Sequence, residues 1–401
     1  MHNPITDRCI GRKPGGHVAP RCARNWIDLM TNLFITVDAE VCAYDPKVDT
    51  PETQIWGKTV DGAAYGIGFI MDELAARGWT CTFFLNVYDT NLWGEDPIAA
   101  IARTIIARGF DVQLHTHVEE TGHLKGLSSF PLPDQCRILR QGADLLEKWT
   151  GVRPIWHRAG NLCANLDTLR ACAAAGFVGD SSYLYGWPQC AELANRSQIG
   201  ATFQKKARRT CSTALCAESE GRRSQIGATS NANARNLIRQ LYGILELPIT
   251  TFRTLPLLHN YRHLDLDACT YQELISIVRQ AVRQGLPHVV LLMHSFSFVR
   301  RTDRGYVANM ENALKFKRFL SAVEQINGIE VVDLKGTNTP HANPLPQGER
   351  APDLSSGLLL TYHRAWEHRG RSWKHKLLVL IPVVLLVMLV VGVLCIRIHK
   401  M

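Results

Sequence analysis

The stretch LFITVDAE at residues 33–40 decides the fold, because five apolar or β-branched residues lead directly into Asp38 and Glu40. Such a run predicts a buried β-strand over residues 33–37 with polar side chains at its carboxyl end. The same arrangement recurs along the chain on both sides of this stretch. The pattern therefore predicts a fold of repeated strands, several of which end in residues able to carry chemistry.

Short β-type runs alternate with helical patterns through the body of the chain. The other β runs are Thr80–Leu85, Val112–His115, Ile155–His157, Phe177–Gly179, Leu245–Thr250, Val289–Met293 and Ile329–Val332. Helical patterns cover Gly62–Arg77, Pro97–Arg108, Asp134–Trp149, Tyr271–Gln284 and Gly305–Ile326. Eight β runs interleaved with helices predict an α/β fold with a mainly parallel sheet, and at this chain length a barrel rather than an open sheet.

Polar side chains collect where the predicted strands end. They are Asp38, Glu40, His115, His117, Arg158, Asp180 and His294. The carboxyl ends of barrel strands form one face, so we expect these distant residues to converge there. Carboxylates, imidazoles and a guanidinium on one rim suit a divalent metal with a base and an acid beside it.

Five short motifs, taken in order, resemble those of the polysaccharide deacetylase family. They are ITVDAE (35–40), LHTH (114–117), RAGN (158–161), GDSS (179–182) and LLMHSFSF (291–298). The resemblance covers about residues 31–334. It implies the nodulation-protein-type deacetylase domain, which is a distorted TIM-like (β/α) barrel.

The resemblance also implies roles for individual residues. Asp38 matches the catalytic base, Arg158 the arginine that holds the base, and His294 the general acid. Glu40 and His115 match metal ligands, with Ala39 at the position of the second acid in the commonest form of the first motif. The family's second motif ends in a histidine where this chain has Glu119, so either Glu119 or His117 completes the metal set.

The resemblance implies a metal-dependent deacetylase, a hydrolase of carbohydrate metabolism that acts on C–N bonds other than peptide bonds or on carbohydrate esters. Zinc is the expected metal, with cobalt, manganese and nickel as alternatives, and an acetylated carbohydrate or sugar-containing precursor is the expected substrate. The departures at Ala39 and Glu119 leave a second interpretation open. In it, the chain is a catalytically impaired relative that binds carbohydrate or acts as a scaffold at a membrane.

Composition narrows the classes of protein. Twelve cysteines without a CxxC pair exclude a disulfide scaffold and a zinc ribbon. The net charge of +9 is concentrated in residues 1–29, 195–235 and 363–401, which leaves the remaining body net acidic. We therefore expect no nucleic-acid partner.

Segments outside the body complete the predicted domain organisation. Residues 1–29 form an N-terminal extension, expected to be disordered, and residues 30–338 form the barrel with a flexible insertion at about 191–234 that contains RSQIGAT twice. Residues 339–376 form a linker and a basic juxtamembrane segment. The uncharged run LLVLIPVVLLVMLVVGVLCI at 377–396 predicts one C-terminal transmembrane helix. The basic residues before it predict a single-pass membrane protein whose main domain is cytoplasmic.

Overall fold

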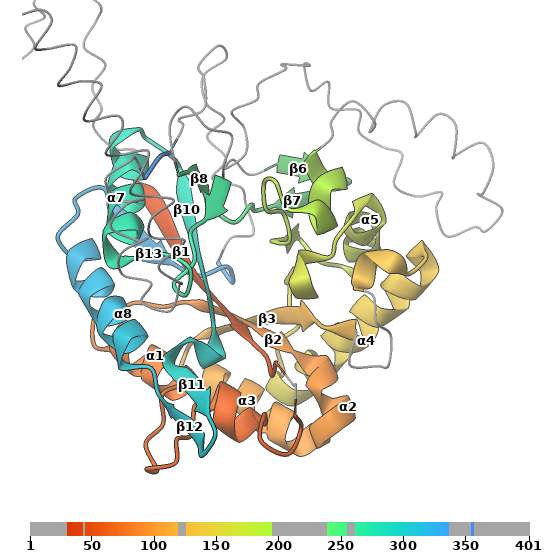
Figure 1. Cartoon of the computed structure of the whole chain (residues 1–401). Coiled ribbons are helices and arrows are strands. Elements are labelled where there is room, and N and C mark those ends of the chain that lie inside the picture. Colours follow the sequence, from red (N-terminus) through yellow and green to blue (C-terminus); the bar gives the residue numbers. More distant parts are fainter. Residues whose placement is uncertain are drawn as a thin grey trace, which may run out of the picture.

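A nine-stranded sheet forms the centre of the molecule (Figure 1). A computed structural model describes residues 30–42, 45–118, 126–194, 239–254, 261–336 and 354–356. The strands of the sheet follow the order β10-β1-β2-β3-β4-β5-β7-β6, and β13 also pairs with β1. Their bounds are β1 Thr31–Ala39, β2 Thr82–Asn86, β3 Asp111–Thr116, β4 Trp156–Ala159, β5 Gly179–Asp180, β6 Arg239–Leu241, β7 Ile244–Glu246, β10 His288–His294 and β13 Ile329–Val332.

Eight of these nine strands coincide with the eight β runs of the sequence, and all eight pair in parallel. The ninth strand, β6, pairs antiparallel with β7 in a tight turn that includes Gly243. Strand β1 pairs with β10, β2 and β13, and its residues are buried without a break from Leu33 to Ala39. Continuous burial is expected of a parallel strand covered on both faces. The predicted α/β class is therefore confirmed.

The predicted barrel is confirmed only in part, because the sheet is curled like half of a barrel and its described strands do not close it. In the described residues no strand ladder joins β6 or β7 to β10. After β7 the chain crosses to β10, where Val290 accepts a backbone hydrogen bond from Thr250. Leu264 and Leu266 then bond to Leu292, but only as an isolated bridge. Short irregular segments meet the edge of β10 where a barrel would have a full strand.

Helices cover the outside of the curled sheet (Figure 1). They are α1 Ile67–Ala75, α2 Thr90–Trp93, α3 Glu95–Ala107, α4 Leu132–Thr150, α5 Leu166–Ala175, α7 Tyr271–Arg283 and α8 Met310–Val323. Side-chain caps fix their starts: Asn165 accepts a hydrogen bond from the Thr168 amide in α5, and Thr270 does the same for Glu273 in α7. Helices α3 and α4 contact β3, and α7 contacts β10.

Gly142, which interrupts the apolar face of α4, has a packing reason. A Cβ at this position would meet Leu114 Cδ1 of β3 at 2.8 Å. The glycine therefore allows α4 to lie close against the strand that carries the site histidine.

Two small hairpins stand beside the main sheet. Strands β8 (Thr251–Arg253) and β9 (Tyr261–His263) form one, and β11 (Val299–Thr302) and β12 (Gly305–Ala308) form the other. The helix predicted from residue 305 therefore begins only at Met310, because residues 305–308 pair with β11 and the Asn309 side chain caps the helix. Within the predicted linker, Ser355 pairs with Arg253 of β8.

Several predicted segments lie outside the described residues. They are residues 1–29, the insertion from residue 195 onward, Glu119, and the predicted transmembrane segment 377–396. Among the helices that are described, none has both the length and the apolar character needed to cross a bilayer.

Candidate active site

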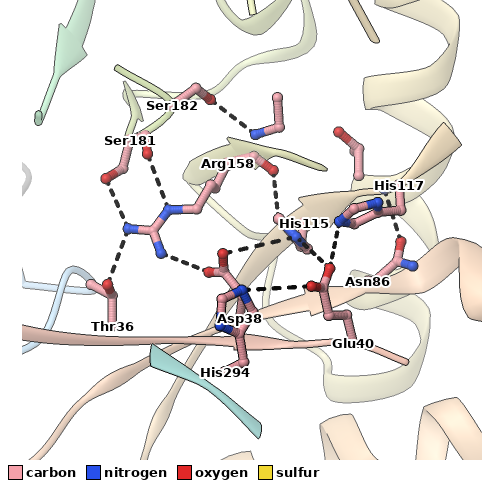
Figure 2. Close-up of polar contacts among 12 residues, drawn as sticks. Thr36, Asp38, Glu40, Asn86, His115, His117, Arg158, Ser181, Ser182 and His294 are labelled. Atoms are coloured by element: carbon pink, nitrogen blue, oxygen red, sulfur yellow. Dashed lines mark hydrogen bonds and ion pairs between the residues drawn. The ribbon is translucent and has the colours of Figure 1, made fainter. Parts of the chain in front are cut away.

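The candidate active site lies at the carboxyl ends of parallel strands (Figure 2). Asp38 lies near the end of β1, His115 in β3 and Arg158 in β4, while His294 ends β10. The strand register places Asp38 opposite His294 and His115 opposite Arg158. Glu40 directly follows β1. The parallel sheet thus brings together residues that are up to 256 positions apart in the sequence.

An ion pair between Asp38 and Arg158 forms the most buried part of the site. Arg158 Nη1 donates to Asp38 Oδ1 at 2.6 Å, and both residues are almost completely excluded from solvent. Arg158 Nη2 donates to Thr36 Oγ1 at 3.1 Å and to Ser181 Oγ at 3.0 Å, and Nε donates to the Ser181 carbonyl. The guanidinium also lies 4.2 Å from the ring centre of Phe84. Arg158 is therefore held in one position, and it holds one oxygen of Asp38.

The two hydroxyls beside Arg158 are oriented to accept its protons. Thr36 Oγ1 donates to the Leu291 carbonyl at 2.8 Å, and Ser181 Oγ donates to the Leu247 carbonyl at 2.9 Å. Each hydroxyl has only one proton, so its lone pairs face the guanidinium. This arrangement satisfies a buried charge, which would otherwise be costly.

Glu40, His115 and His117 form a second group, the strand-end cluster (Figure 2). Glu40 Oε2 lies 2.9 Å from His115 Nε2 and 2.5 Å from His117 Nε2. His115 Nδ1 lies 2.9 Å from the Arg158 carbonyl, which can only accept, so Nδ1 carries a proton. The Nε2 atom of His115 is thereby directed at the carboxylate.

Glu40 ionises readily despite its burial. Burial alone would raise its pKa, but the charge and hydrogen bond of His117, together with those of His115, outweigh it. The pKa of Glu40 is therefore held well below the usual glutamate value. Ionised Glu40 is therefore favoured by its two imidazole neighbours.

Two buried residues tie together the loops that carry the cluster. Asn86 Oδ1 accepts from the His117 amide at 3.1 Å, and Asn86 Nδ2 donates to Asp89 Oδ1 at 2.8 Å. Asp89 Oδ2 accepts from the Val41 amide, next to Glu40, at 3.2 Å. Asn86 and Asp89 thus fix the backbone on both sides of the cluster.

His294 lies on the open side of the site. Its Nε2 atom is 3.8 Å from Glu40 Oε1, its Nδ1 atom is 3.7 Å from Asp267 Oδ2, and its side chain is 26% exposed. Burial alone would lower its pKa. The contact with Asp267 and the charges of Glu40 and Asp38 outweigh burial and raise the pKa to about 9. His294 is thus a protonated imidazolium at neutral pH.

The donor atoms of the strand-end cluster fit a divalent metal. Two imidazoles and one carboxylate are the ligand types of a catalytic zinc site, in which a fourth position is left for water or substrate. The carbonyl that fixes the Nδ1 proton of His115 is the second partner that metal-bound histidines usually have. Glu119, the other predicted ligand, lies outside the described residues.

Asp180, expected at the same rim, lies elsewhere. With His157 and Cys172 it forms a fully enclosed group, the buried cluster, in which Asp180 Oδ2 lies 2.6 Å from His157 Nδ1. Neighbouring residues of a strand point to opposite faces of the sheet, so His157 faces away from the site that Arg158 faces. Asp180 therefore does not contact Asp38 through any described interaction.

Asp267 is the residue of the site that the sequence did not indicate. It lies in a loop, where Ser297 Oγ and Asn312 Nδ2 donate to its two oxygens at 2.6 and 2.8 Å. The sequence LDLDACT before α7 contained the signal, since it brings two acids next to a helix start. Such acids are common caps, so this signal alone does not separate a site residue from a turn residue.

Comparison with known proteins gives structural neighbours only. No family model matches the chain, and no curated protein matches it. A Mycobacterium smegmatis protein assigned to the polysaccharide deacetylases shares 15% identity over 77% of this chain and 89% of its own, with a TM-score of 0.43. A family 4 carbohydrate esterase from Streptomyces lividans shares 8% identity over 75% and 91% of the two chains, with a TM-score of 0.38.

A family 4 pseudoenzyme from Bacillus anthracis is also similar, with 11% identity over 76% of this chain and 64% of its own and a TM-score of 0.36. The structural neighbours are thus family 4 deacetylases and esterases together with a relative described as a pseudoenzyme. Similarity of this extent assigns no activity to the chain, which has to be inferred from its own site residues.

Proposed function

We propose that this protein is a metal-dependent hydrolase that removes N- or O-linked acetyl groups from a carbohydrate or a sugar-containing precursor. One observation carries the proposal: the Asp38–Arg158 ion pair lies directly beside a cluster of one carboxylate and two imidazoles. Asp38 Oδ2 is 4.0 Å from His115 Nε2, so the base and the cluster share one small space. The sequence motifs that resemble the polysaccharide deacetylase family agree with this chemistry.

Asp38 acts as the general base. Arg158 occupies its Oδ1 atom, which leaves Oδ2 to accept a proton from the attacking water. The charge-assisted hydrogen bond fixes the direction of the carboxylate. Because Arg158 is fully buried, water does not compete for its hydrogen bond to Asp38.

His294 acts as the general acid, and it lies beside Asp38 on the neighbouring strand. Because its pKa is raised to about 9, His294 carries a proton at neutral pH that it can donate to the departing amine or alkoxide. Asp267 at Nδ1 orients the ring and leaves Nε2 directed toward Glu40 and the site. Asp38 thus accepts a proton in the reaction and His294 donates one.

Glu40, His115 and His117 would hold the cation, which when bound supplies Lewis-acid polarisation of the acetyl carbonyl and of the attacking water. Asn86 and Asp89 keep their backbones in place.

Acetate release tests the proposal. The full chain is freed of metal, reconstituted separately with zinc, cobalt, manganese or nickel, and assayed on N-acetylated and O-acetylated sugars. We expect acetate release that requires metal and that is lost in His115→Ala. The absence of acetate release from every substrate with every metal would contradict the proposal.

The alternative is a catalytically impaired relative that binds carbohydrate or acts as a membrane-tethered scaffold. The direct pairing of Glu40 with both histidines favours it, because these donors satisfy one another. Metal content separates the two functions. One bound divalent ion that is lost in His115→Ala favours the enzyme, whereas sugar binding by a metal-free protein favours the alternative.

The proposal includes membrane attachment through residues 377–396, with the main domain in the cytoplasm. Twenty uncharged, mostly apolar residues are enough to cross the hydrocarbon core. A chain truncated after Gly357 should no longer pellet with membranes after a carbonate wash. Continued pelleting would show that attachment has another cause.

A further inference from the structure

Residues 354–356, far beyond the last strand of the sheet, lie against β8 and α7 (Figure 1). The Arg253 amide donates to the Leu354 carbonyl at 2.9 Å, and the Ser356 amide donates to the Arg253 carbonyl at 2.9 Å. These two bonds form an isolated parallel bridge between Ser355 and Arg253 on the edge of β8 that faces away from β9, which resembles peptide recognition by strand addition.

The opposite edge of the same segment is held by a side chain. Gln280 of α7 donates from Nε2 to the Ser355 carbonyl at 2.8 Å and accepts the Ser355 amide at Oε1. Successive backbone groups of a strand point to opposite edges, so the β8 edge and Gln280 together satisfy both. Leu354 is 1% exposed and belongs to the main core, and Ser356 Oγ donates to the Thr254 carbonyl.

This docking surface is connected to the active site. The other edge of β8 pairs with β9, and residues 264–266 after β9 bond to Thr250 and to Leu292 of β10. The next residue is Asp267, whose carboxylate lies 3.7 Å from His294 Nδ1. A short path of backbone hydrogen bonds thus leads from Ser355 to the partner of the proposed acid.

We infer that the β8 edge and Gln280 form a docking site whose occupant is residues 354–356 of the same chain. When residues 354–356 are docked, they keep the β8–β9 hairpin in place. The hairpin in turn keeps residues 264–267 in the position that brings Asp267 to His294. The importance of Asp267 rests on the proposed function, whereas the docking itself does not.

The docking also shortens the tether to the predicted membrane span. Forty residues separate Gly336 from Leu377, but only twenty separate Ser356 from Leu377. At about 3.5 Å for each extended residue, docking reduces the maximum reach from about 140 Å to about 70 Å. The domain is thereby kept nearer to the surface to which we propose it is attached.

Hydrogen exchange on the full-length chain tests the inference. Gln280→Ala removes both bonds to Ser355, and Leu354→Ala independently removes the buried side chain. In both variants we expect the amides of Arg253 and Ser356 to exchange at least about tenfold faster, with a smaller acceleration at Leu264, Leu266 and Leu292. Gln284→Ala, at an exposed position at the end of the same helix, is the matched control and should change none of them.

Four outcomes decide the inference. Unchanged exchange at Arg253 and Ser356 in both variants would overturn the docking, and acceleration that stops there would overturn the coupling to Asp267. A full-length dimer that dissociates in Gln280→Ala would show that the occupant comes from a second copy. Zinc binding by the strand-end cluster should be the same in each variant as in the parent. If the parent shows the expected exchange but releases no acetate, the proposed function is contradicted and the docking is not.

Discussion

Two clusters of this protein hold similar donor atoms in different environments. The strand-end cluster has one carboxylate and two imidazoles, and the buried cluster has one carboxylate, one imidazole and one thiol. In the strand-end cluster, the side chains of His117 and Glu40 are 16% and 11% exposed. In the buried cluster, the side chains of His157 and Asp180 have no exposure at all.

The donors of the buried cluster are already engaged. His157 Nε2 lies 3.0 Å from Thr116 Oγ1, its Nδ1 atom lies 2.6 Å from Asp180, and the Ser182 amide donates to Asp180 Oδ1. Burial, together with the charge of Asp180, raises the pKa of the Cys172 thiol well above its usual value. A thiol that keeps its proton is a poor metal ligand. Residue types alone therefore do not define a metal site, because access to solvent and the protonation state of the donors also decide it.

Loss of the strand-end cluster should have the largest effect. In His115→Ala, we expect bound metal to fall from about one ion to none, and turnover to fall at least about 10³-fold, because the proposed Lewis acid is lost. Metal content is measured by elemental analysis after dialysis. Cys172→Ala, in the buried cluster, is the control and should keep its metal; the opposite result would reverse the roles of the two clusters.

The acid and the base should be separable from the metal ligands. Asp38→Asn and His294→Ala should each lower turnover by about 10²–10⁴-fold, the usual contribution of positioned proton transfer. Neither side chain belongs to the strand-end cluster, so both variants should retain the metal. The measurement is turnover beside metal content in one preparation, and near-parental turnover in both variants would contradict the mechanism.

Damage to the buried cluster should reduce stability instead. In Asp180→Asn, the enclosed His157 loses its charged partner, and removing one member of a buried pair costs about 3–5 kcal/mol. Asp144→Asn breaks the exposed pair with Arg153 and should cost less than about 1 kcal/mol. Urea unfolding measures both. A larger loss of metal affinity than of stability in Asp180→Asn would give the buried cluster a role in the site.

The sequence predicts the strands well because each core strand is encoded locally. Leu33–Val37 and Val289–Met293 are apolar runs bounded by polar residues, and both become buried strands that pair in parallel with each other. Closure is different, since it depends on whether distant segments meet edge to edge. Arg239–Leu241 contains two polar residues among three and gave no signal of the strand β6. Strand β6 lies at one end of the sheet, and residues 247–250 form no strand between it and β10. The described strands therefore do not close into a barrel.

The same limit applies to the site. Asp38, His115 and Arg158 lie at strand ends, where the period of the strand predicts a shared rim. Asp180 also lies at a strand end but faces the opposite side, because a one-residue shift of register reverses the face. Asp267 reaches His294 from a loop whose position is set by tertiary contacts, so no local pattern predicts it.

The smallest predicted effect compares Glu40 with Asp111, a buried carboxylate at the opposite end of β3 from the site. Asp111 accepts hydrogen bonds from Thr82 and Gln113 but has no imidazole partner among the described residues, so burial raises its pKa to about 6. The pKa of Asp111 is about 4 in the unfolded chain and about 6 in the folded protein. Between about pH 4 and about pH 6, Asp111 is therefore protonated more fully in the folded state than in the unfolded state. The contribution of Asp111 to stability is therefore greatest at low pH and is lost as the pH rises through about 6.

Asp111→Asn should remove this dependence, because a neutral amide does not ionise while its oxygen can still accept a hydrogen bond. Relative to the parent, the variant should gain about 2 kcal/mol of unfolding free energy between about pH 4.5 and about pH 7.5. Urea unfolding at the two pH values gives this double difference. Glu40 has the opposite shift, because His115 and His117 hold its pKa down, so its contribution to stability is lost as the pH falls rather than as it rises. If the pH dependence of stability were the same in Asp111→Asn as in the parent, the raised pKa of Asp111 would be contradicted.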